Sequence, residues 1–289
     1  MNTTSELINL LTLQKIGKNL FKGNSSYMGS PNVFGGQVVA QALHAAYQTV
    51  PKDRFCHSLH SYFILPGNLE IPIQYEVTIL RDGGSFTTRS VTAKQEGKAI
   101  FMMACSFQLD QEGGLNHQID MPEVKVPEDL MSWNDIGKMF GPMLPKQIQK
   151  FVTTDRPLDF KPVEIPTPFE KKDYEPVSNV WMKFLDVEES SYSLPLLHQL
   201  IAYSSDYNVL STALMPHASK AHFGNMQLAC LDHSLWFHRK PNLTDWMLLN
   251  VESPSASNTR GFTKGNIFNR SGELVCSLTQ EGLIRPIQR

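Results

Sequence analysis

Along this chain, segments whose apolar residues recur at helical spacing alternate with extended segments bounded by turn-forming residues. Residues 36–50 predict a buried helix, because their apolar side chains recur three and four positions apart and Pro51 ends the run. Extended segments follow at residues 56–65, 73–80, 85–95 and 99–109, separated by Pro-Gly, Asp-Gly-Gly and Glu-Gly turns. One helix followed by antiparallel strands predicts a helix covered by a strongly curved sheet.

The second half of the chain repeats this order. We expect a helical region at residues 195–214 and strands at residues 177–187, 226–239, 245–252, 260–269 and 273–281. Residues 1–18 predict a short amphipathic helix, and the proline-rich, charged segment between the halves predicts a linker with one helix near residues 128–140. The predicted parts are an N-terminal domain, a linker and a C-terminal domain, at residues 1–112, 113–175 and 176–289.

Matching residues recur about 170 positions apart in the two halves. The matches pair His60-Ser61 with His233-Ser234, Arg89 with Arg260, Cys105 with Cys276, and Gln108 with Gln280. A period of this length indicates an internal duplication, whose halves can pack as a pseudo-symmetric pair and then diverge in function. We therefore expect the functional site where the halves differ.

The composition is typical of a soluble globular protein. Of the 289 residues, 41% are apolar and 10% aromatic, which is enough for a sizeable core. The net charge of −2 argues against nucleic acid or an anionic membrane as a partner, and no apolar run is long enough to span a bilayer. No secretion signal or peroxisomal Ser-Lys-Leu address is present, and the four cysteines lack disulfide or zinc spacing. We expect a cytoplasmic protein with reduced thiols and no metal.

Asp206 is the first candidate for chemistry. Its neighbours three and four positions away are apolar, a setting that raises the pKa of a carboxyl group. The residues alone leave a second interpretation open, in which Asp206 caps a helix that starts at Tyr207. Gln280, at the end of the last strand, offers an amide donor and acceptor that can orient a water molecule. The repeat places Asp206 opposite Val33, so the first half lacks a base.

Two further segments suggest chemistry. Gly35 and Gly36 precede the first helix, where a backbone N–H can approach a developing oxyanion, although the pair also fits a tight turn before a packed helix. The sequence Asp232-His233-Ser234 suggests a catalytic triad, but strand alternation places Cys230, Asp232 and Ser234 on one face and His233 on the other. We therefore expect His233 to be a packed or hydrogen-bonded histidine.

Six segments in order resemble the acyl-CoA thioesterase II family, from about residue 5 to the end of the chain. They are VFGGQVV at 33–39, HSYF at 60–63, LRDG at 80–83, SSDYN at 204–208, LDHSLWFHR at 231–239 and QEG at 280–282. The resemblance implies an α+β fold, the double hotdog, with two curved antiparallel sheets each wrapped around a central helix. It also implies hydrolysis of fatty acyl-CoA without a metal or other cofactor, by a homodimer or homotetramer. The water would be held and activated by Asp206, Gln280 and the residue at position 230.

Cys230 departs from the Ser or Thr that the family carries there. Because a thiol is a weak hydrogen-bonding group, three outcomes are open: reduced activity, positioning of the water by another group such as Ser234, or attack by a thiolate. Arg260 is a candidate contact for the phosphates of coenzyme A, although it can equally be structural. Two other functions stay open. One is an enoyl-CoA hydratase or dehydratase, which needs a His/Asp pair, and the other is a non-catalytic acyl-CoA sensor.

Overall fold

The structure, a computed structural model, describes residues 1–111, 113–144, 149, 153–165, 171–187, 192–222 and 224–287. The first half contains α1 (Thr4–Leu11), β1 (Gln14–Gly17), β2 (Leu20–Gly23), α2 (Gly35–Tyr47), β3 (Arg54–Phe63), β4 (Ile73–Asp82), β5 (Phe86–Gln95) and β6 (Lys98–Leu109). The connecting segment contains η1 (Pro127–Asp129), α3 (Trp133–Phe140), η2 (Gly141–Met143) and β7 (Leu158–Pro162). The second half contains β8 (Val177–Phe184), α5 (Leu194–Ser204), η3 (Val209–His217), β9 (Met226–Cys230), β10 (Asp232–Phe237), β11 (Met247–Ser257), β12 (Arg260–Asn269) and β13 (Leu274–Pro286).

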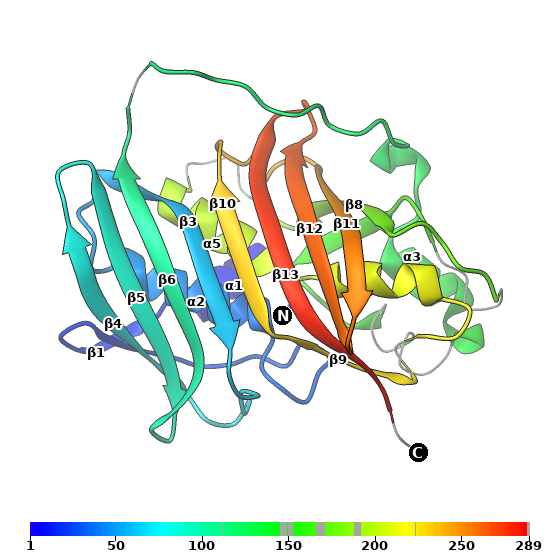
Figure 1. Cartoon of the computed structure of the whole chain (residues 1–289), viewed down its shortest axis with the longest axis horizontal. Coiled ribbons are helices and arrows are strands. Elements are labelled where there is room, and N and C mark those ends of the chain that lie inside the picture. Colours follow the sequence, from blue (N-terminus) through cyan, green and yellow to red (C-terminus); the bar gives the residue numbers. More distant parts are fainter. Residues whose placement is uncertain are drawn as a thin grey trace.

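The described strands form one continuous antiparallel sheet. Its order is β1-β2-β4-β5-β6-β3-β10-β13-β12-β11-β8-β7, with β9 pairing on β13 (Figure 1). The halves meet where β3 pairs with β10, and there Ser234 lies opposite His60. In both halves two strands precede the helix, and a strand that comes after it, β3 or β10, lies at the centre of the sheet. The two halves therefore share one order of elements.

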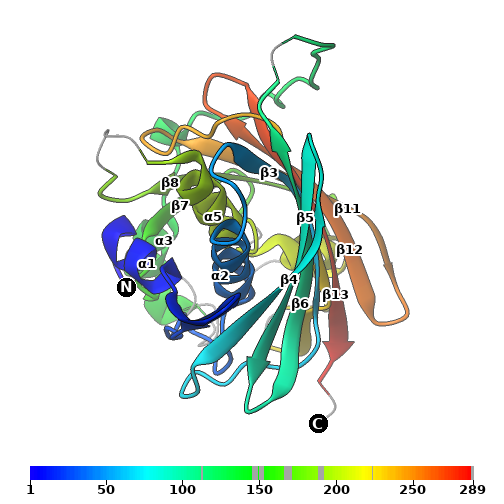
Figure 2. The ribbon, with the colours of Figure 1, turned by 90° about the vertical axis from the view of Figure 1, so that its left-hand side faces the viewer.

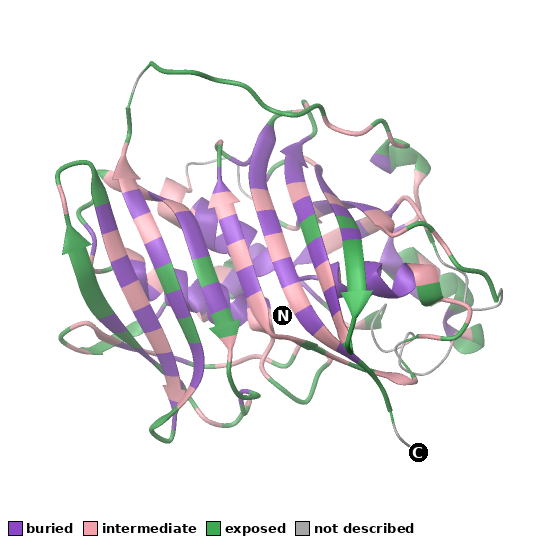
Figure 3. Ribbon diagram, viewed as in Figure 1, coloured by how far each residue is buried: buried purple, intermediate pink, exposed green. Residues whose placement is uncertain are grey.

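The helices α2 and α5 lie side by side against one face of the sheet (Figure 2). Val39 and Leu43 of α2 and Leu200 and Tyr203 of α5 are fully buried. Both helices are apolar on most sides, which is expected of helices enclosed by other elements. Buried and more exposed residues alternate along many of the strands (Figure 3), because successive side chains point to opposite faces. The core therefore lies between the sheet and the two helices.

Three predicted elements need correction. Residues 1–18 do not form a single helix, because α1 ends at Leu11 and β1 and β2 form a hairpin that turns at Asn19, whose φ is 55°. The predicted helical region 195–214 is helical, but in two parts, α5 and η3. It breaks after Ser204, where the chain passes through Asn208 with a φ of 59°. The predicted linker also contributes a strand, β7, which pairs with β8. Strands of four or five residues carry too few periodic positions to show in the pattern.

The predicted repeat register is wrong at several matches. His60 is exposed and His233 fully buried, and the side chain of Arg89 is 1% exposed against 40% for Arg260. Such pairs lie on opposite faces of the sheet, since a slip of one residue moves a side chain to the other face. Cys105 and Cys276 are both buried, so their predicted core positions are confirmed. Gln108 and Gln280, matched in the sequence, differ in the same way, being half-buried and fully buried.

Candidate active site

Asp206 lies where helix α5 ends. Ser205 is the C-cap residue, with its N–H bonded to the carbonyl of Ile201 at 2.9 Å, and Asp206 is the next residue. The following helical segment begins at Val209, after Asn208 in the left-handed conformation, and has no side-chain cap. The capping interpretation of Asp206 is therefore wrong, and its carboxylate makes other contacts.

Asp206, Gln280 and Cys230 meet inside the protein. Gln280 Nε2 donates a hydrogen bond to Asp206 Oδ1 at 2.5 Å, and the Cys230 thiol donates to the same oxygen at 3.3 Å. Gln280 Nε2 also lies 3.1 Å from Cys230 Sγ. Asp206 is 8% exposed and Gln280 is fully buried. Within the described part of the chain, Gln280 Oε1 has no hydrogen-bond partner, so one acceptor remains available in the cluster.

The N-terminus of α2 faces this carboxylate. The backbone N–H of Gly36 donates a hydrogen bond to Asp206, and a helix N-terminus favours a negative charge. A Cβ atom on Gly35 would lie 2.5 Å from Asp206 Oδ2 and 3.0 Å from the ring of Phe63. A side chain at position 35 would therefore displace the carboxylate of Asp206. Sequence reasoning missed Phe63, although this residue ends the HSYF segment.

Burial raises the pKa of the Asp206 carboxyl group to about 6, against the lowering effect of hydrogen bonds from Gln280, Cys230 and Gly36. Burial and the neighbouring carboxylate also raise the pKa of the Cys230 thiol well above its usual value. At neutral pH the carboxyl group is therefore mostly ionised and the thiol is protonated. The cluster offers a base of moderate strength, and the environment disfavours a thiolate.

A β-bulge turns Cys230 toward the interior. Cys230 lies opposite Gly282 and Ser234 lies opposite Thr279, so β9 and β10 contain one residue more than β13 between these two pairs. The extra residue shifts the alternation of side chains by one position. The prediction that Cys230 and Ser234 share a face is therefore wrong, and Cys230 instead points toward Asp206.

As predicted, the segment from Asp232 to Ser234 does not form a catalytic triad. His233 is fully buried on the inner face, whereas Ser234 is half-buried on the outer face with its Oγ 3.1 Å from His60 Nδ1. The carboxylate of Asp232 accepts a hydrogen bond from the N–H of Glu281 at 3.0 Å. The prediction that His233 is a packed or hydrogen-bonded histidine is confirmed, since its ring is buried and its Nε2 lies 2.9 Å from the Ser205 hydroxyl.

Arg260 also lies away from the carboxylate cluster. Its guanidinium forms an ion pair with Glu281 at 3.0 Å, and the two side chains are 40% and 34% exposed. Glu281 follows the inward-facing Gln280 along β13, so this pair lies on the outer face of the sheet. The structure thus brings Gly35 and Gly36 to Asp206 but not Ser234 or Arg260, whose substrate contacts stay predictions.

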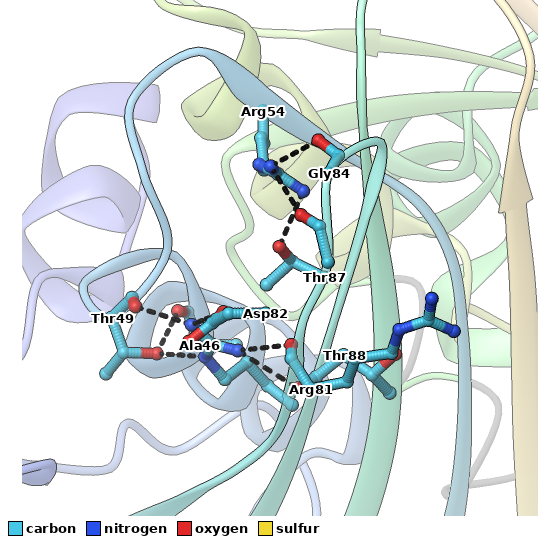
Figure 4. Close-up of polar contacts among 10 residues, drawn as sticks. Ala46, Thr49, Arg54, Arg81, Asp82, Gly84, Thr87 and Thr88 are labelled. Carbon is cyan, nitrogen blue, oxygen red and sulfur yellow. Dashed lines mark hydrogen bonds and ion pairs between the residues drawn. The ribbon is translucent and has the colours of Figure 1, made fainter.

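The end of helix α2 in the first half is built differently. Thr49 is the first residue after the C-cap of α2, the place that Asp206 occupies after α5, so Thr49 rather than the predicted Val33 corresponds to Asp206. The buried guanidinium of Arg89 donates to Thr49 Oγ1 at 3.0 Å and to the Thr49 carbonyl at 2.9 Å. Its other N–H groups bond to the carbonyls of Arg81 and Thr88 and to the carboxylate of Asp82, three residues that Figure 4 labels together with Thr49.

Among the described residues, no group of three or more His, Cys, Asp or Glu side chains is placed to hold a metal ion. No helix in that part of the chain is both long and apolar enough to cross a membrane.

Comparisons with known proteins point in one direction. Residues 148–283 match the family model for acyl-CoA thioesterase, and residues 24–108 match the acyl-CoA thioesterase N-terminal domain. The acyl-CoA thioesterase 2 of Haemophilus influenzae is 38% identical over 281 residues, which cover 97% of each chain.

Solved structures are similar over almost the whole chain. The acyl-CoA thioesterase II TesB2 from Mycobacterium marinum matches with a TM-score of 0.77 at 33% identity, over 96% of this chain and 98% of that chain. A protein of unknown function with a hot dog fold from Alicyclobacillus acidocaldarius matches with a TM-score of 0.76 at 16% identity, over 99% of this chain and 100% of that one. At that identity the second match bears on the fold alone, and together they confirm the predicted hotdog fold.

Proposed function

The chain belongs to the acyl-CoA thioesterase family, and on that premise we propose that Asp206, Gln280 and Cys230 hold and activate the water molecule that cleaves the substrate. The protein is a thioester hydrolase that converts acyl-CoA to a free acid and coenzyme A. The observation that carries the residue assignment is a buried carboxyl group with a pKa of about 6, in hydrogen-bond contact with a buried amide.

The proposed reaction begins with ionised Asp206. The carboxylate takes one proton from water while the water oxygen attacks the thioester carbonyl carbon and forms a C–O bond. Collapse of the tetrahedral adduct breaks the C–S bond, and Asp206 returns the proton to the departing sulfur of coenzyme A. General-base catalysis of this kind contributes about 10² to 10⁴ in rate. Turnover should fall as the pH drops through about 6, because Asp206 then becomes protonated.

The neighbours of Asp206 have separate roles in this proposal. Gln280 holds the carboxylate through Nε2 and presents Oε1 to the second hydrogen of the water molecule. Cys230 donates its S–H to Asp206 and stays neutral, so it supports the carboxylate without attacking the substrate. Because the N–H of Gly36 bonds to Asp206, we assign it to the carboxylate rather than to the thioester oxygen.

We also propose that the fold is a double hotdog that arose by internal duplication, with an N-terminal hotdog at residues 1–112, a linker at 113–175 and a C-terminal hotdog at 176–289. The shared order of elements in the two halves and their junction at β3 and β10 support this division. Part of the linker lies outside the described residues.

The proposed setting is the cytoplasm, and the proposed assembly is a homodimer or homotetramer. Exposed apolar side chains on the sheet of the first half support self-association, among them Tyr62, Leu80 and Met102. Their exposed fractions are 62%, 57% and 45%.

The function is tested by following release of coenzyme A with a thiol reagent across acyl-CoA substrates of increasing chain length. We expect turnover with fatty acyl-CoA and a rate that depends on chain length. Tight acyl-CoA binding without thiol release would instead select the sensor. Hydration of an enoyl-CoA without thiol release would select a hydratase.

A further inference from the structure

A buried histidine on the central strand β10 contacts the turn that carries Asp206. His233 Nε2 lies 2.9 Å from the hydroxyl of Ser205, the residue directly before Asp206. Both His233 and Ser205 are fully buried. Neither residue takes part in the proposed reaction, yet their bond connects the sheet to the end of helix α5.

His233 is held by both halves of the molecule. It lies opposite Ser61 of β3, and the Ser61 hydroxyl donates a hydrogen bond to the His233 carbonyl at 2.7 Å. On its other side, β10 pairs with β13 through Ser234 and Thr279. The neighbouring residues His233 and Gln280 are both fully buried, so they face the interior on adjacent strands.

The hydrogen-bond pattern favours one tautomer of His233. The single hydroxyl hydrogen of Ser205 is donated to the carbonyl of Ala202 at 3.0 Å, so the Ser205 oxygen accepts from His233 Nε2–H. His233 Nδ1 is then an acceptor without a partner among the described residues. Burial lowers the pKa of His233 to about 4, so the ring is neutral at physiological pH and the direction of this bond does not change.

We propose that His233 is a positioning residue, which acts through Ser205 to hold Asp206 in register with Gln280 and Cys230. This inference rests on the proposed role of Asp206 as the base. The hydrogen bonds to Asp206 come from β13, β9 and α2, whereas Asp206 itself is attached to α5. The bond between His233 and Ser205 joins the end of α5 to the sheet one residue before Asp206. A displacement of about 1 Å at a reacting group can cost roughly 100-fold in rate.

Two substitutions separate the hydrogen bond from the packing. In His233→Gln the amide nitrogen occupies the place of Nε2 and keeps a donor for Ser205. In His233→Asn the shorter side chain does not reach it. We expect kcat of His233→Asn to fall about 100-fold with KM within about threefold of wild type, and kcat of His233→Gln to stay within about fivefold. We also expect the acid limb of the kcat profile to move in His233→Asn, because a displaced Asp206 would change both the burial that raises its pKa and the hydrogen bonds that lower it.

The matched control is His198, a second buried histidine that lies on α5 itself. Its Nδ1 lies 2.9 Å from the hydroxyl of Tyr47, and burial lowers its pKa to about 3. We expect His198→Asn to lower the melting temperature while leaving the acid limb of the kcat profile in place. Ser205→Ala removes the acceptor for His233 together with the donor to the Ala202 carbonyl, and it is the second test should His233→Asn not fold. It should lower kcat about as much, and adding His233→Asn to it should cost little more.

The proposal is overturned if His233→Asn or Ser205→Ala keeps wild-type kcat and an unmoved acid limb, or if His233→Gln is no better than His233→Asn. The proposed role of Asp206 as the base is tested separately, with Asp206→Asn. If Asp206→Asn keeps full turnover, Asp206 is not the base and His233 has no base to position. If Asp206→Asn is inactive while His233→Asn is fully active, only the positioning role is lost.

Discussion

The central helices of the two halves, α2 and α5, end beside side chains of opposite charge. After α5, a buried carboxyl group contacts an amide and a thiol. After α2, Thr49 accepts from the buried guanidinium of Arg89, all of whose N–H groups are bonded. A helix C-terminus carries a partial negative charge, so a cation suits the end of α2, whereas a carboxylate at the end of α5 is disfavoured.

The position directly after the C-cap of the central helix therefore has a structural role in the first half, at Thr49, and a chemical role in the second half, at Asp206. Arg89 donates to the hydroxyl and the carbonyl of Thr49 after the end of α2 and leaves no group there for chemistry. Asp206 is kept in a costly environment, where burial raises its pKa and the N–H of Gly36 on the neighbouring helix offsets part of the cost. We therefore expect one reactive site in each chain. Its reacting residues come from the second half, and residues of both halves surround them.

Replacing Asp206 should have the largest effect. In Asp206→Asn the base is lost but the shape is kept, so kcat should fall by about 10² to 10⁴ while the protein stays folded. Release of coenzyme A and circular dichroism measure the two quantities. The control is Asp82→Asn, which changes the carboxylate paired with Arg89 in the first half, and there kcat should remain within about twofold of wild type. Equal losses in both variants would contradict the comparison.

Gly35→Ala should be next, because the new methyl group would lie 2.5 Å from Asp206 Oδ2. Displacing the carboxylate should lower kcat by about 100-fold. Gly84→Ala is a suitable control, since a Cβ atom there meets nothing within 4 Å. A fully active Gly35→Ala variant would show that the α2 N-terminus does not have to approach the base so closely.

Replacing Arg89 should affect stability rather than catalysis. In Arg89→Met the carbonyls of Thr49, Arg81 and Thr88 lose a donor inside the protein, which we expect to cost about 3 kcal/mol of unfolding free energy. Urea denaturation measures this loss, and kcat of the folded fraction should not change. A large fall in kcat at unchanged stability would place Arg89 in the reaction instead.

The raised pKa of Asp206 makes its cost in stability depend on pH. As the pH rises from about 4 to about 6, the unfolded chain loses the Asp206 proton before the folded protein does, so wild-type stability falls. The shift from 3.8 to about 6 corresponds to about 3 kcal/mol. Asp206→Asn lacks this loss, and its stability relative to wild type should therefore increase by about that amount between pH 4 and pH 7. A difference that does not vary with pH in denaturation experiments would refute the raised pKa.

The smallest effect is expected at position 230. In Cys230→Thr a hydroxyl replaces a thiol whose pKa is raised by burial, so the stronger hydrogen-bonding group should keep kcat or raise it a few-fold. Cys230→Ala, which lacks a donor, is the matched comparison. A sharp loss of turnover in Cys230→Thr would indicate attack by the thiolate.

Much of the fold was predictable from local pattern, and the reasons are physical. The helix over 36–50 and the strands after it are long and strongly periodic, and α2 and β3 to β6 lie close to the predicted positions. β1, β2 and β7 are short and lie at the ends of the sheet, so the pattern did not reveal them. The break in the region 195–214 depends on a left-handed Asn208, which apolar spacing does not signal.

The candidate site was only partly predictable. Asp206, Gln280 and Cys230 were found through resemblance to a family, and apolar neighbours also indicated a raised pKa for Asp206. The direction of Cys230 was missed, because a single extra residue between β9 and β10 reverses the alternation. The contact between Asp206 and the N-terminus of α2 could not be seen either, since it joins residues about 170 positions apart.

The sequence by itself determined two apolar helices, most of the strands around them and the presence of an acid, an amide and a thiol in the second half. Those features follow from local spacing and residue type, which act over a few positions. The tertiary structure alone decided which side chains face one another, that Thr49 with Arg89 is the counterpart of Asp206, and that His233 contacts the turn before the acid. The reason is that strand register and helix ends are set by pairing and packing between distant segments, where a shift of one residue exchanges the inside for the outside.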